Sequence, residues 1–376
     1  MDSFAFIIHP IDPKRDVSRK FPLLGRLLTE REIDLLSTLF PPVYLSEITG
    51  ITSAANGKQI KGWLVACPYT PRRMLELPER TVYGKIVQTG RMAEALGAQI
   101  LGLGAYTSVV GDAGLTIARE LAVPVTTGDA FTVSVAVQAL CAAADAMGIA
   151  LHNATAAVVG ATGAIGRVCS ELLVGQVGGL ILIANDLTKL EVLRERLRRE
   201  ARSPVLVGTT TDMLAQADLI LTVTSALNAV IQPADLRPGS IICDVARPRD
   251  VSAMVVQARD DILVIDGGMV NVPGPVDFHF NFGFPPGKAY ACMAETMTLA
   301  LEGRFEDYTV GKEISLQRVN EIATLAYKHG FRLSGFRSFE REVTEAQIDR
   351  VRRQVRRGGK GISGRSQEAK WAKPAY

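Results

Sequence analysis

A glycine-rich segment at residues 155–166, TAAVVGATGAIG, follows a short apolar run and leads into a helix-like stretch. The spacing is typical of a dinucleotide-binding turn. Gly160 permits a tight turn, Gly163 lets a pyrophosphate approach the backbone, and Gly166 lets the helix pack on the sheet. The helix N-terminus would direct its free N–H groups at the phosphates. The expected contacts are Gly160, Ala161, Thr162, Gly163, Ala164, Ile165 and Gly166.

Further cofactor contacts are expected after later strands of the same sheet. Asp186 lies about 20 residues beyond the glycines, where an acid accepts hydrogen bonds from the ribose of NADH. Lys189 can instead neutralise the 2′-phosphate of NADPH, and Asp186 can also be explained as an acid at a helix N-terminus. Asn185, Thr224 and Ser225 complete the expected set.

Cys292 is the candidate for covalent chemistry. Residues 288–304 are expected to form a helix after a Gly/Pro-rich loop, with Cys292 in its first turn and away from the apolar stripe that includes Met293. Helix N–H groups and the helix dipole lower the pKa of a thiol there, which favours a reactive thiolate. The alternative is an inert cysteine, which is how we interpret the other four cysteines.

Two of the four histidines are candidates for proton transfer. His9 ends an expected strand, where functional groups gather in an open α/β sheet, and His279 lies in the loop before Cys292. A structural role is the alternative for each. Four residues at strand ends are interpreted either as substrate-pocket residues or as ordinary turn residues: Tyr106, Thr107, Thr126 and Thr127. No zinc-ligand spacing is present, and no metal is expected.

The elements around these residues indicate an α/β fold. Polar or helical segments separate successive apolar runs, as a parallel sheet with crossover helices requires. These runs lie at 180–184, 205–207, 219–223, 241–245 and 262–265. Further strands are expected at 4–8, 43–48, 60–66, 98–103 and 123–126. We therefore expect a Rossmann-type, doubly wound dinucleotide-binding domain plus an α/β substrate domain built from the N-terminal part and C-terminal helices.

The expected domain division has four parts. Residues 1–150 form the first part of the substrate domain, and residues 151–270 form the dinucleotide-binding domain. Residues 271–337 supply an active-site loop and helices that return to the substrate domain, and residues 338–376 form a basic, partly disordered tail. A long helix from Asp129, its expected N-cap, to Met147 would connect the domains, and a second helix is expected at 316–329.

Composition is that of a soluble globular protein with two domains: 376 residues, 47% hydrophobic and 22% charged. The net charge of +3 arises in residues 341–376, a charged helix followed by a Gly/Ser/Lys segment expected to be solvated. Five scattered cysteines indicate a reducing compartment, so a cytoplasmic location is expected. No signal peptide or bilayer-spanning segment is expected, and no motif indicates nucleic-acid binding.

Several segments together resemble the long-chain acyl-(acyl carrier protein) reductases of the cyanobacterial fatty aldehyde pathway over most of residues 1–335. They are RDVSRK, PPVYLSEIT, SAANGKQIKGW, LGAYTSVV, TTGDAFT, AAVVGATGAIG, AYACMAETMTLALEG and KHGF. In that family the cysteine of the A-C-x-A-E segment accepts the acyl group, and Cys292 occupies that position. Where the family carries an Arg suited to a 2′-phosphate, this chain has Asn185.

The resemblance implies reduction of a fatty acyl thioester, carried by acyl carrier protein or coenzyme A, to a fatty aldehyde through an acyl-enzyme on Cys292. NADPH is the expected cofactor, with NADH as the alternative. An aldehyde-consuming enzyme or peripheral membrane contact is a further expected partner. Two alternatives stay open: a non-covalent hydroxy-acid or amino-acid dehydrogenase like the shikimate dehydrogenases, and a nucleotide-binding sensor without catalysis.

Overall fold

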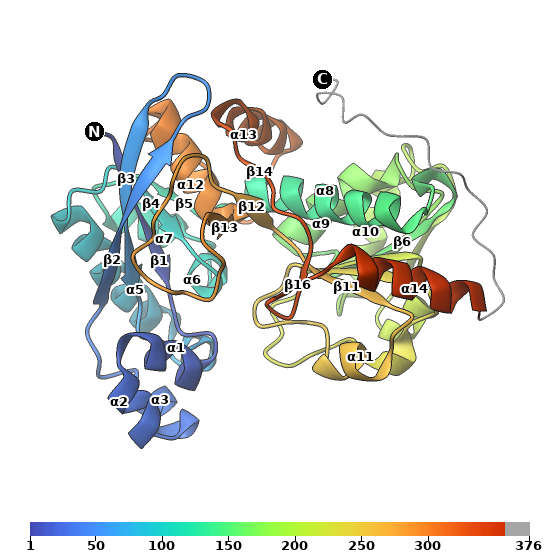
Figure 1. Ribbon diagram of the computed structural model, residues 1–376, viewed down its shortest axis with the longest axis horizontal. Helices are drawn as coiled ribbons and strands as arrows, with labels where there is room; N and C mark the ends of the chain where they lie inside the picture. The colour runs from blue at the N-terminus through green and yellow to red at the C-terminus, as the bar shows by residue number, and fades with distance from the viewer. Residues whose placement is uncertain (358–376) are drawn as a thin grey trace.

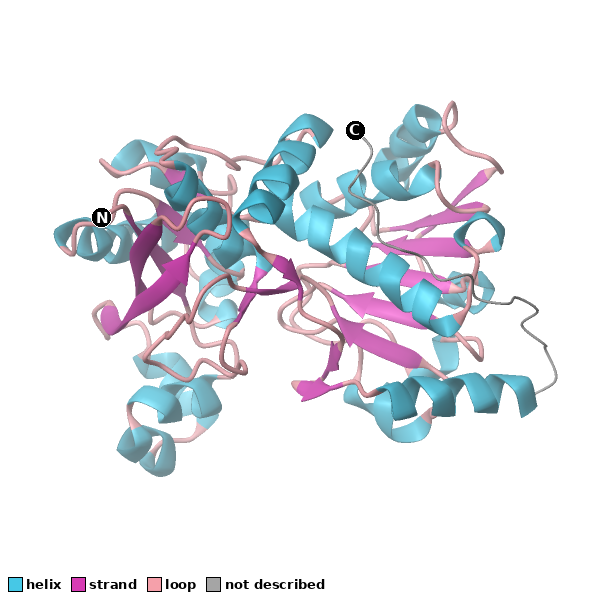
Figure 2. Cartoon of the chain, turned by 45° about the horizontal axis from the view of Figure 1, so that its top comes forward, coloured by secondary structure: helices cyan, strands magenta, loops and turns pink. Residues whose placement is uncertain are grey.

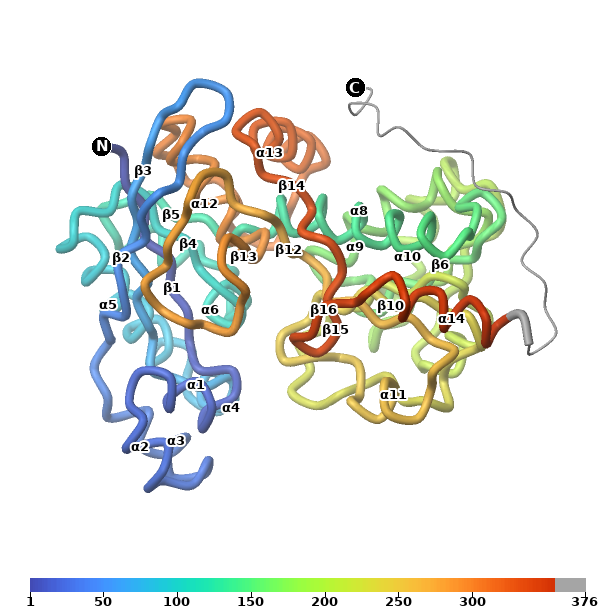
Figure 3. Tube along the Cα trace, in the orientation of Figure 1, coloured from blue at the N-terminus to red at the C-terminus, as the bar shows by residue number. Residues whose placement is uncertain are grey.

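The computed structural model describes residues 1–357 and shows two α/β units joined through helix α8 (Asp129–Met147) (Figures 1 and 3). The first sheet has the order β2-β3-β1-β4-β5, in which β2 is antiparallel to β3 and the other neighbours are parallel. Its strands are β1 (Ser3–Ile8), β2 (Val43–Thr52), β3 (Gln59–Ala66), β4 (Leu101–Leu103) and β5 (Val125–Thr126).

Strand β1 has apolar side chains on both of its faces, and helices cover both faces of the first sheet. Phe4 and Phe6 pack in one core cluster with helix α12 (Ala291–Glu302), whereas Ala5 and Ile7 pack in another with helix α5 (Glu79–Ala95). Successive side chains of a strand point to opposite faces, so a strand that is apolar at every position belongs to a sheet covered on both sides. Figure 2 shows the strands of both units enclosed by helices.

The second sheet consists of six parallel strands in the order β11-β10-β9-β6-β7-β8. This is the doubly wound Rossmann order, so the predicted α/β fold is confirmed. The strands are β6 (Thr155–Val159), β7 (Gly179–Ile183), β8 (Val205–Gly208), β9 (Leu219–Thr222), β10 (Ile241–Asp244) and β11 (Leu263–Asp266). Strand order reverses between β6 and β9, and ligands of such sheets bind outside the carboxyl ends at that point.

Helix α8 packs against both units. It contacts α9 (Ala164–Val174) and β10 on one side, and α12 and α13 (Leu316–His329) on the other. Its N-cap is Gly128, and Asp129 is the first helical residue, so the expectation of Asp129 as N-cap is wrong. Glycine takes this place because φ is 76° there. By length and composition α8 is apolar enough to cross a membrane, contrary to expectation, but 67% of that stretch is buried in the protein.

The chain returns from the second unit through an antiparallel sheet of β12 (Met269–Asn271), β13 (Lys288–Tyr290) and β14 (Arg332–Leu333). The expected helix at 288–304 is therefore too long at its N-terminus, because residues 288–290 pair with β12 before α12 begins. Gly303, with φ of 71°, ends α12.

Three short helices near the N-terminus form a separate layer beside the first sheet: α1 (Pro13–Lys20), α2 (Pro22–Leu27) and α3 (Glu30–Leu36). Side-chain N-caps from Asp12 and Thr29 begin α1 and α3. The remaining helices are α4 (Pro71–Glu76), α6 (Tyr106–Val109), α7 (Leu115–Glu120), α10 (Leu187–Leu197) and α11 (Ala253–Ala258), with 3₁₀ turns at Leu151–Asn153, Thr211–Gln216 and Pro233–Asp235.

The basic C-terminal segment contains the charged helix that the sequence predicts, but that helix is not solvated on all sides. After a hairpin of β15 (Arg337–Ser338) and β16 (Arg341–Glu342), helix α14 (Glu345–Arg357) lies along the second unit. Its residues Ile348, Val351 and Val355 are buried at helical spacing, so one face of this charged helix is not solvated. The expected disorder beyond residue 357 lies outside the described residues.

Candidate active site

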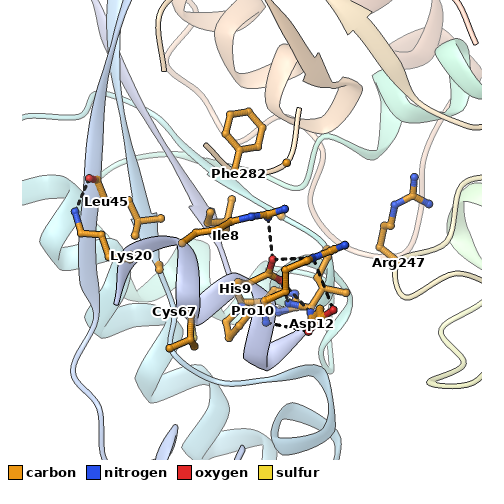
Figure 4. A pocket seen from close by; sticks show the side chains of 18 of the residues that line it. Ile8, His9, Pro10, Asp12, Lys20, Leu45, Cys67, Arg247 and Phe282 are labelled. Atoms are coloured by element: carbon orange, nitrogen blue, oxygen red, sulfur yellow. Dashed lines mark hydrogen bonds and ion pairs between the residues drawn. The ribbon is translucent and has the colours of Figure 1, made fainter. Parts of the chain in front are cut away.

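A cavity of about 550 Å³ lies between the carboxyl ends of β1 and β3, helices α1–α3, the loop 272–287 and an edge of the second unit (Figure 4). Its lining is mainly apolar and includes Ile8, Leu24, Ile33 and Phe282, from four separate segments. A mainly apolar pocket of this size suits a ligand with a long apolar part. Cys292 and His9 both lie on its wall, which makes it the candidate active site.

Four aromatic rings hold the loop 272–287 against the cavity. Phe278 meets Phe282 edge to face with ring centroids 4.8 Å apart, Phe282 meets Phe284 at 5.0 Å, and Phe284 meets Tyr290 at 4.4 Å. Aromatic pairs in this arrangement each contribute about 0.5–1.5 kcal/mol beyond their buried area. The last three rings line the cavity, so the expected active-site loop forms an apolar wall of the cavity.

Several of the positive side chains at the cavity are paired with acids. Arg15 forms a 2.7 Å ion pair with Glu340, and Arg19 a 2.9 Å pair with Asp16. Lys20 donates to the Leu45 carbonyl at 2.8 Å (Figure 4). Since Arg15 belongs to the first unit and Glu340 to the hairpin on the second, their ion pair joins the two units beside the cavity.

Cys292 is the second residue of α12, as the expected first-turn position requires. The helix packs so closely on the start of α8 that a Cβ atom on Gly128 would lie 2.2 Å from the Cys292 Cα atom. Burial, followed by the charges of the nearby Asp129 and Glu295 carboxylates, raises the pKa of the Cys292 thiol to about 12. The expectation of a lowered thiol pKa is therefore wrong, because burial and two acids outweigh the helix N-terminus.

The two acids beside Cys292 were not expected as parts of the site. Burial, followed by the charge of Glu295, raises the pKa of Asp129 to about 7. Glu295 accepts hydrogen bonds from the Thr126 hydroxyl, from the Thr309 hydroxyl at 2.7 Å and from the Phe131 N–H at 2.9 Å. Burial still raises its pKa. The thiol therefore lies next to a carboxyl group that exchanges protons near neutral pH.

His9 follows β1 and lies on the cavity wall at 6% exposure. Burial lowers its pKa to about 4, so the imidazole is neutral at physiological pH. At neutral pH such a ring is a weak base and supplies almost no imidazolium as an acid, so the expected role in proton transfer gains no support. A neutral imidazole still offers one N–H donor.

His279 does not join this site, contrary to expectation. Its side chain is half exposed, forms a 3.2 Å contact with Asp277 and lies 3.1 Å from the Thr49 hydroxyl. It does not line the cavity. Thr49 and Asp277 also form a backbone bridge, so His279 reinforces the point where the loop 272–287 meets β2.

The four expected substrate-pocket residues do not line the cavity either. Tyr106 is buried, and its hydroxyl donates to the Ser225 carbonyl in the second unit. Thr107 donates to the Gly104 carbonyl at 2.8 Å, which is ordinary turn chemistry. Thr126 donates to Glu295, and Thr127 is buried. These residues therefore make contacts within the protein next to the cavity and do not form its wall.

The glycine turn has the shape that a dinucleotide pyrophosphate requires. Gly160 has φ of 84°, and a Cβ there would lie 2.4 Å from the Val223 carbonyl oxygen. A Cβ on Gly166 would lie 2.2 Å from the Gly160 carbonyl oxygen, so α9 can approach the turn only with glycine there. Beside Gly163 the space is open apart from that same carbonyl, at 3.2 Å. The turn and the N-terminus of α9 therefore fit a pyrophosphate.

The other expected cofactor contacts lie around the carboxyl ends of β7 and β9. Asp186 is the N-cap of α10, accepts from the Lys189 N–H at 3.1 Å and pairs with the Lys189 ammonium at 3.2 Å. Asn185 precedes this cap. The Thr224 N–H and hydroxyl both donate to the buried Asp250, and the Ser225 carbonyl accepts from the Tyr106 hydroxyl. The acid at 186 thus has a capping role, which the sequence allowed as an alternative.

The fold and the glycine turn define a two-unit NAD(P)-dependent oxidoreductase. Residues 142–266 match the family model of shikimate / quinate 5-dehydrogenase, which covers the second unit and the end of α8. Among solved structures, L-tryptophan dehydrogenase from Nostoc punctiforme is similar at 13% identity and a TM-score of 0.42, over 95% of this chain and 89% of that one.

The chain belongs to the long-chain acyl-(acyl carrier protein) reductase family. It is 30% identical over 346 residues to the long-chain acyl-(acyl carrier protein) reductase of Synechococcus elongatus. The match covers 87% of this chain and 98% of that protein. It is also 33% identical over 363 residues to aminotransferase PigE of a Serratia species; the match covers 93% of this chain but 42% of PigE. The resemblance noted from the sequence motifs is thereby confirmed at the level of the family.

Proposed function

We propose that this protein reduces a fatty acyl thioester, carried by acyl carrier protein or coenzyme A, to a fatty aldehyde through an acyl-enzyme on Cys292. One observation carries the proposal: Cys292 lies on the wall of a mainly apolar cavity of about 550 Å³. An acyl chain in that cavity removes apolar surface from water, and each buried methylene contributes about 0.8 kcal/mol. The cavity thus suits the apolar part of the substrate, and Cys292 its reactive end.

In the acyl transfer the Cys292 sulfur forms a bond to the acyl carbon, and the bond from that carbon to the carrier sulfur breaks. The proton of the Cys292 thiol is needed on the departing carrier thiol, so the transfer consumes no proton overall. Asp129, whose pKa burial raises to about 7, lies close enough to act on the thiol electrostatically and is suited to hold that proton in transit.

A nicotinamide cofactor, when bound, supplies the hydride that reduces the acyl carbon. The glycine turn at Gly160 and the N-terminus of α9 would hold its pyrophosphate. We propose NADPH as the preferred form, because the exposed Lys189 ammonium is the cation that follows β7. Release of the aldehyde breaks the bond between the former acyl carbon and the Cys292 sulfur. The first proton has left on the carrier thiol, so the sulfur takes up a second proton from solvent to become a thiol again, and the reduction consumes one proton with each hydride.

A non-covalent dehydrogenase of hydroxy or amino acids is the second candidate, because the shikimate / quinate 5-dehydrogenase model matches residues 142–266. That match covers the nucleotide-binding unit rather than the cavity. A small polar acid would leave most of an apolar cavity unfilled. The cavity therefore favours the fatty acyl substrate.

The decisive experiment compares Cys292→Ala with Cys67→Ala. Cys67 also lines the cavity but is fully buried, so it is a matched control. Incubation with radioactive hexadecanoyl-coenzyme A should label the wild type and Cys67→Ala, and should fail to label Cys292→Ala, which also forms no aldehyde with NADPH. Undiminished aldehyde formation by Cys292→Ala would refute the acyl-enzyme and favour the non-covalent dehydrogenase. Absence of both NADPH and NADH oxidation by the wild type with acyl thioesters would refute the reductase, and the non-covalent dehydrogenase and the sensor would then be the candidates.

A further inference from the structure

The acyl transfer places a negative charge on the acyl oxygen, and this charge needs hydrogen-bond donors. The first turn of α12 is one source of N–H groups, but the Met293 N–H acts on the Cys292 sulfur itself, where it lowers the thiol pKa against the larger effect of burial. The oxygen therefore needs at least one donor from another segment. This requirement rests on the proposed function.

The tautomer of His9 follows from its contacts. The backbone N–H of Tyr106 donates to His9 Nε2 at 3.0 Å. A backbone N–H can only donate, so Nε2 must be the acceptor, and the proton of the neutral ring lies on Nδ1. The pKa of about 4, set by burial against a smaller opposite effect of the Pro10 backbone, keeps the ring in that neutral form.

The Nδ1–H group is an unused donor. Among residues 1–357, no group makes a hydrogen bond of acceptable geometry with His9 Nδ1, and this atom is itself shielded from solvent. The Pro10 carbonyl lies near enough to act on the ring but does not satisfy hydrogen-bond geometry. A buried donor left without a partner costs about 1–3 kcal/mol, and such groups persist where a ligand supplies the partner. His9, labelled in Figure 4, lies on the wall of this cavity. Cys292 lines the same cavity, so a ligand that reaches Cys292 also comes near the imidazole.

The position of His9 is held from two sides. Ala105, with φ of 48°, turns the chain after β4 so that the next N–H meets Nε2. The Tyr106 ring packs edge to face on the imidazole with ring centroids 6.2 Å apart, and its hydroxyl is anchored on the Ser225 carbonyl. A donor that is fixed before the substrate arrives needs little reorganisation as charge develops.

We propose that His9 is a catalytic residue that donates a hydrogen bond from Nδ1 to the acyl oxygen while Cys292 attacks the thioester. His9 remains neutral throughout and transfers no proton. Its contribution is to stabilise the negative charge on that oxygen in the tetrahedral intermediate. The charge exists from the attack of Cys292 until the carrier thiol leaves and the oxygen becomes a carbonyl again.

Two amide variants separate this role from a structural one. His9→Asn keeps a donor near the place of Nδ1 but loses the acceptor for the Tyr106 N–H. His9→Gln keeps an acceptor near the place of Nε2 but loses the Nδ1 donor. We expect His9→Gln to slow acyl-enzyme formation about 100-fold, the loss typical of one oxyanion donor, and His9→Asn to slow it less than tenfold. If His9 only positions Tyr106, the order of the two variants reverses.

The assay measures acylation of Cys292 by hexadecanoyl-coenzyme A in intact-protein mass spectra, without nucleotide, so the readout is independent of the reduction step. Unchanged melting temperatures show that each variant folds. Equal acylation rates in wild type and His9→Gln would overturn the role of His9, while Cys292→Ala still failed to acylate. Acylation that persists in Cys292→Ala would instead overturn the proposed function itself, so the two failures are distinguishable.

Discussion

Replacement of Gly128 by alanine tests how closely helix α8 holds the candidate nucleophile. The added Cβ would lie 2.2 Å from the Cys292 Cα atom and 2.5 Å from its carbonyl oxygen. Both are backbone atoms, which cannot rotate away as a flexible side chain does. Unstrained carbon contacts are about 3.5–4.0 Å long, so one of the two backbones must shift by roughly 1 Å or more.

Two contributions set the loss in the free energy of unfolding that we expect for Gly128→Ala. Gly128 has φ of 76°, and alanine in that left-handed conformation costs about 1–2 kcal/mol. The forced contact adds about 1–3 kcal/mol, as overpacking of a core does. We therefore expect the free energy of unfolding to fall by about 2–5 kcal/mol. Displacement of a reacting group by about 1 Å costs roughly 100-fold in rate, so acylation of Cys292 should fall by that factor.

Gly148, at the other end of α8, offers a matched control. Its φ is 73°, and nothing lies within 4 Å of an added Cβ. Gly148→Ala should cost only the 1–2 kcal/mol of the left-handed backbone and leave acylation unchanged. Urea unfolding and acylation by hexadecanoyl-coenzyme A measure both quantities. Indistinguishable stability and acylation in the two variants would refute the inferred contact between α8 and Cys292.

Three further predictions concern protonation and cofactor choice. Because burial and Asp129 raise the pKa of Cys292 to about 12, iodoacetamide at pH 8 should alkylate this thiol about 1,000 times more slowly than free cysteine. Asp129→Asn should increase the alkylation rate, which peptide mass spectrometry measures. A wild-type rate equal to that of free cysteine would contradict the prediction. Burial lowers the pKa of His9 to about 4, so between about pH 4 and 6.5 the unfolded chain binds a proton that the folded chain does not. Acidification through this window should lower the free energy of unfolding by up to about 3 kcal/mol in the wild type and by less in His9→Gln, whereas equal losses in urea titrations would refute this reasoning. Lys189→Ala should raise KM for NADPH about tenfold and leave KM for NADH unchanged in initial-rate assays, and equal changes for both would exclude a role at the 2′-phosphate.

Much of the fold follows from local patterns in the sequence. Apolar runs separated by polar segments predicted every strand of the second sheet to within a residue or two, and the helix expected at 316–329 has those bounds. Helices α1–α3 could not be predicted in this way. They have six to eight residues each, too few for a clear helical period, and several of their apolar side chains face a cavity rather than a core.

The candidate site was predictable in position but not in environment. The sequence indicated Cys292 at a helix start and His9 at a strand end, and the structure places both on one cavity wall. The thiol pKa was predicted in the wrong direction, because the helix effect is local whereas burial arises from α8, which is distant in sequence. Proximity along the chain likewise favoured His279, yet its loop turns that side chain toward Thr49 and away from Cys292.

The packing of α8 also limits how the protein can be divided. A single continuous core cluster contains Phe4 and Phe6 of the first sheet, Leu140 of α8, and Val158 and Leu219 of the second sheet. A cut near residue 150 would therefore expose apolar surface on both fragments, so neither unit is a module that can be exchanged or expressed alone. Because both units depend on this shared core, a change to the nucleotide-binding unit or to the cavity must be made within the intact chain.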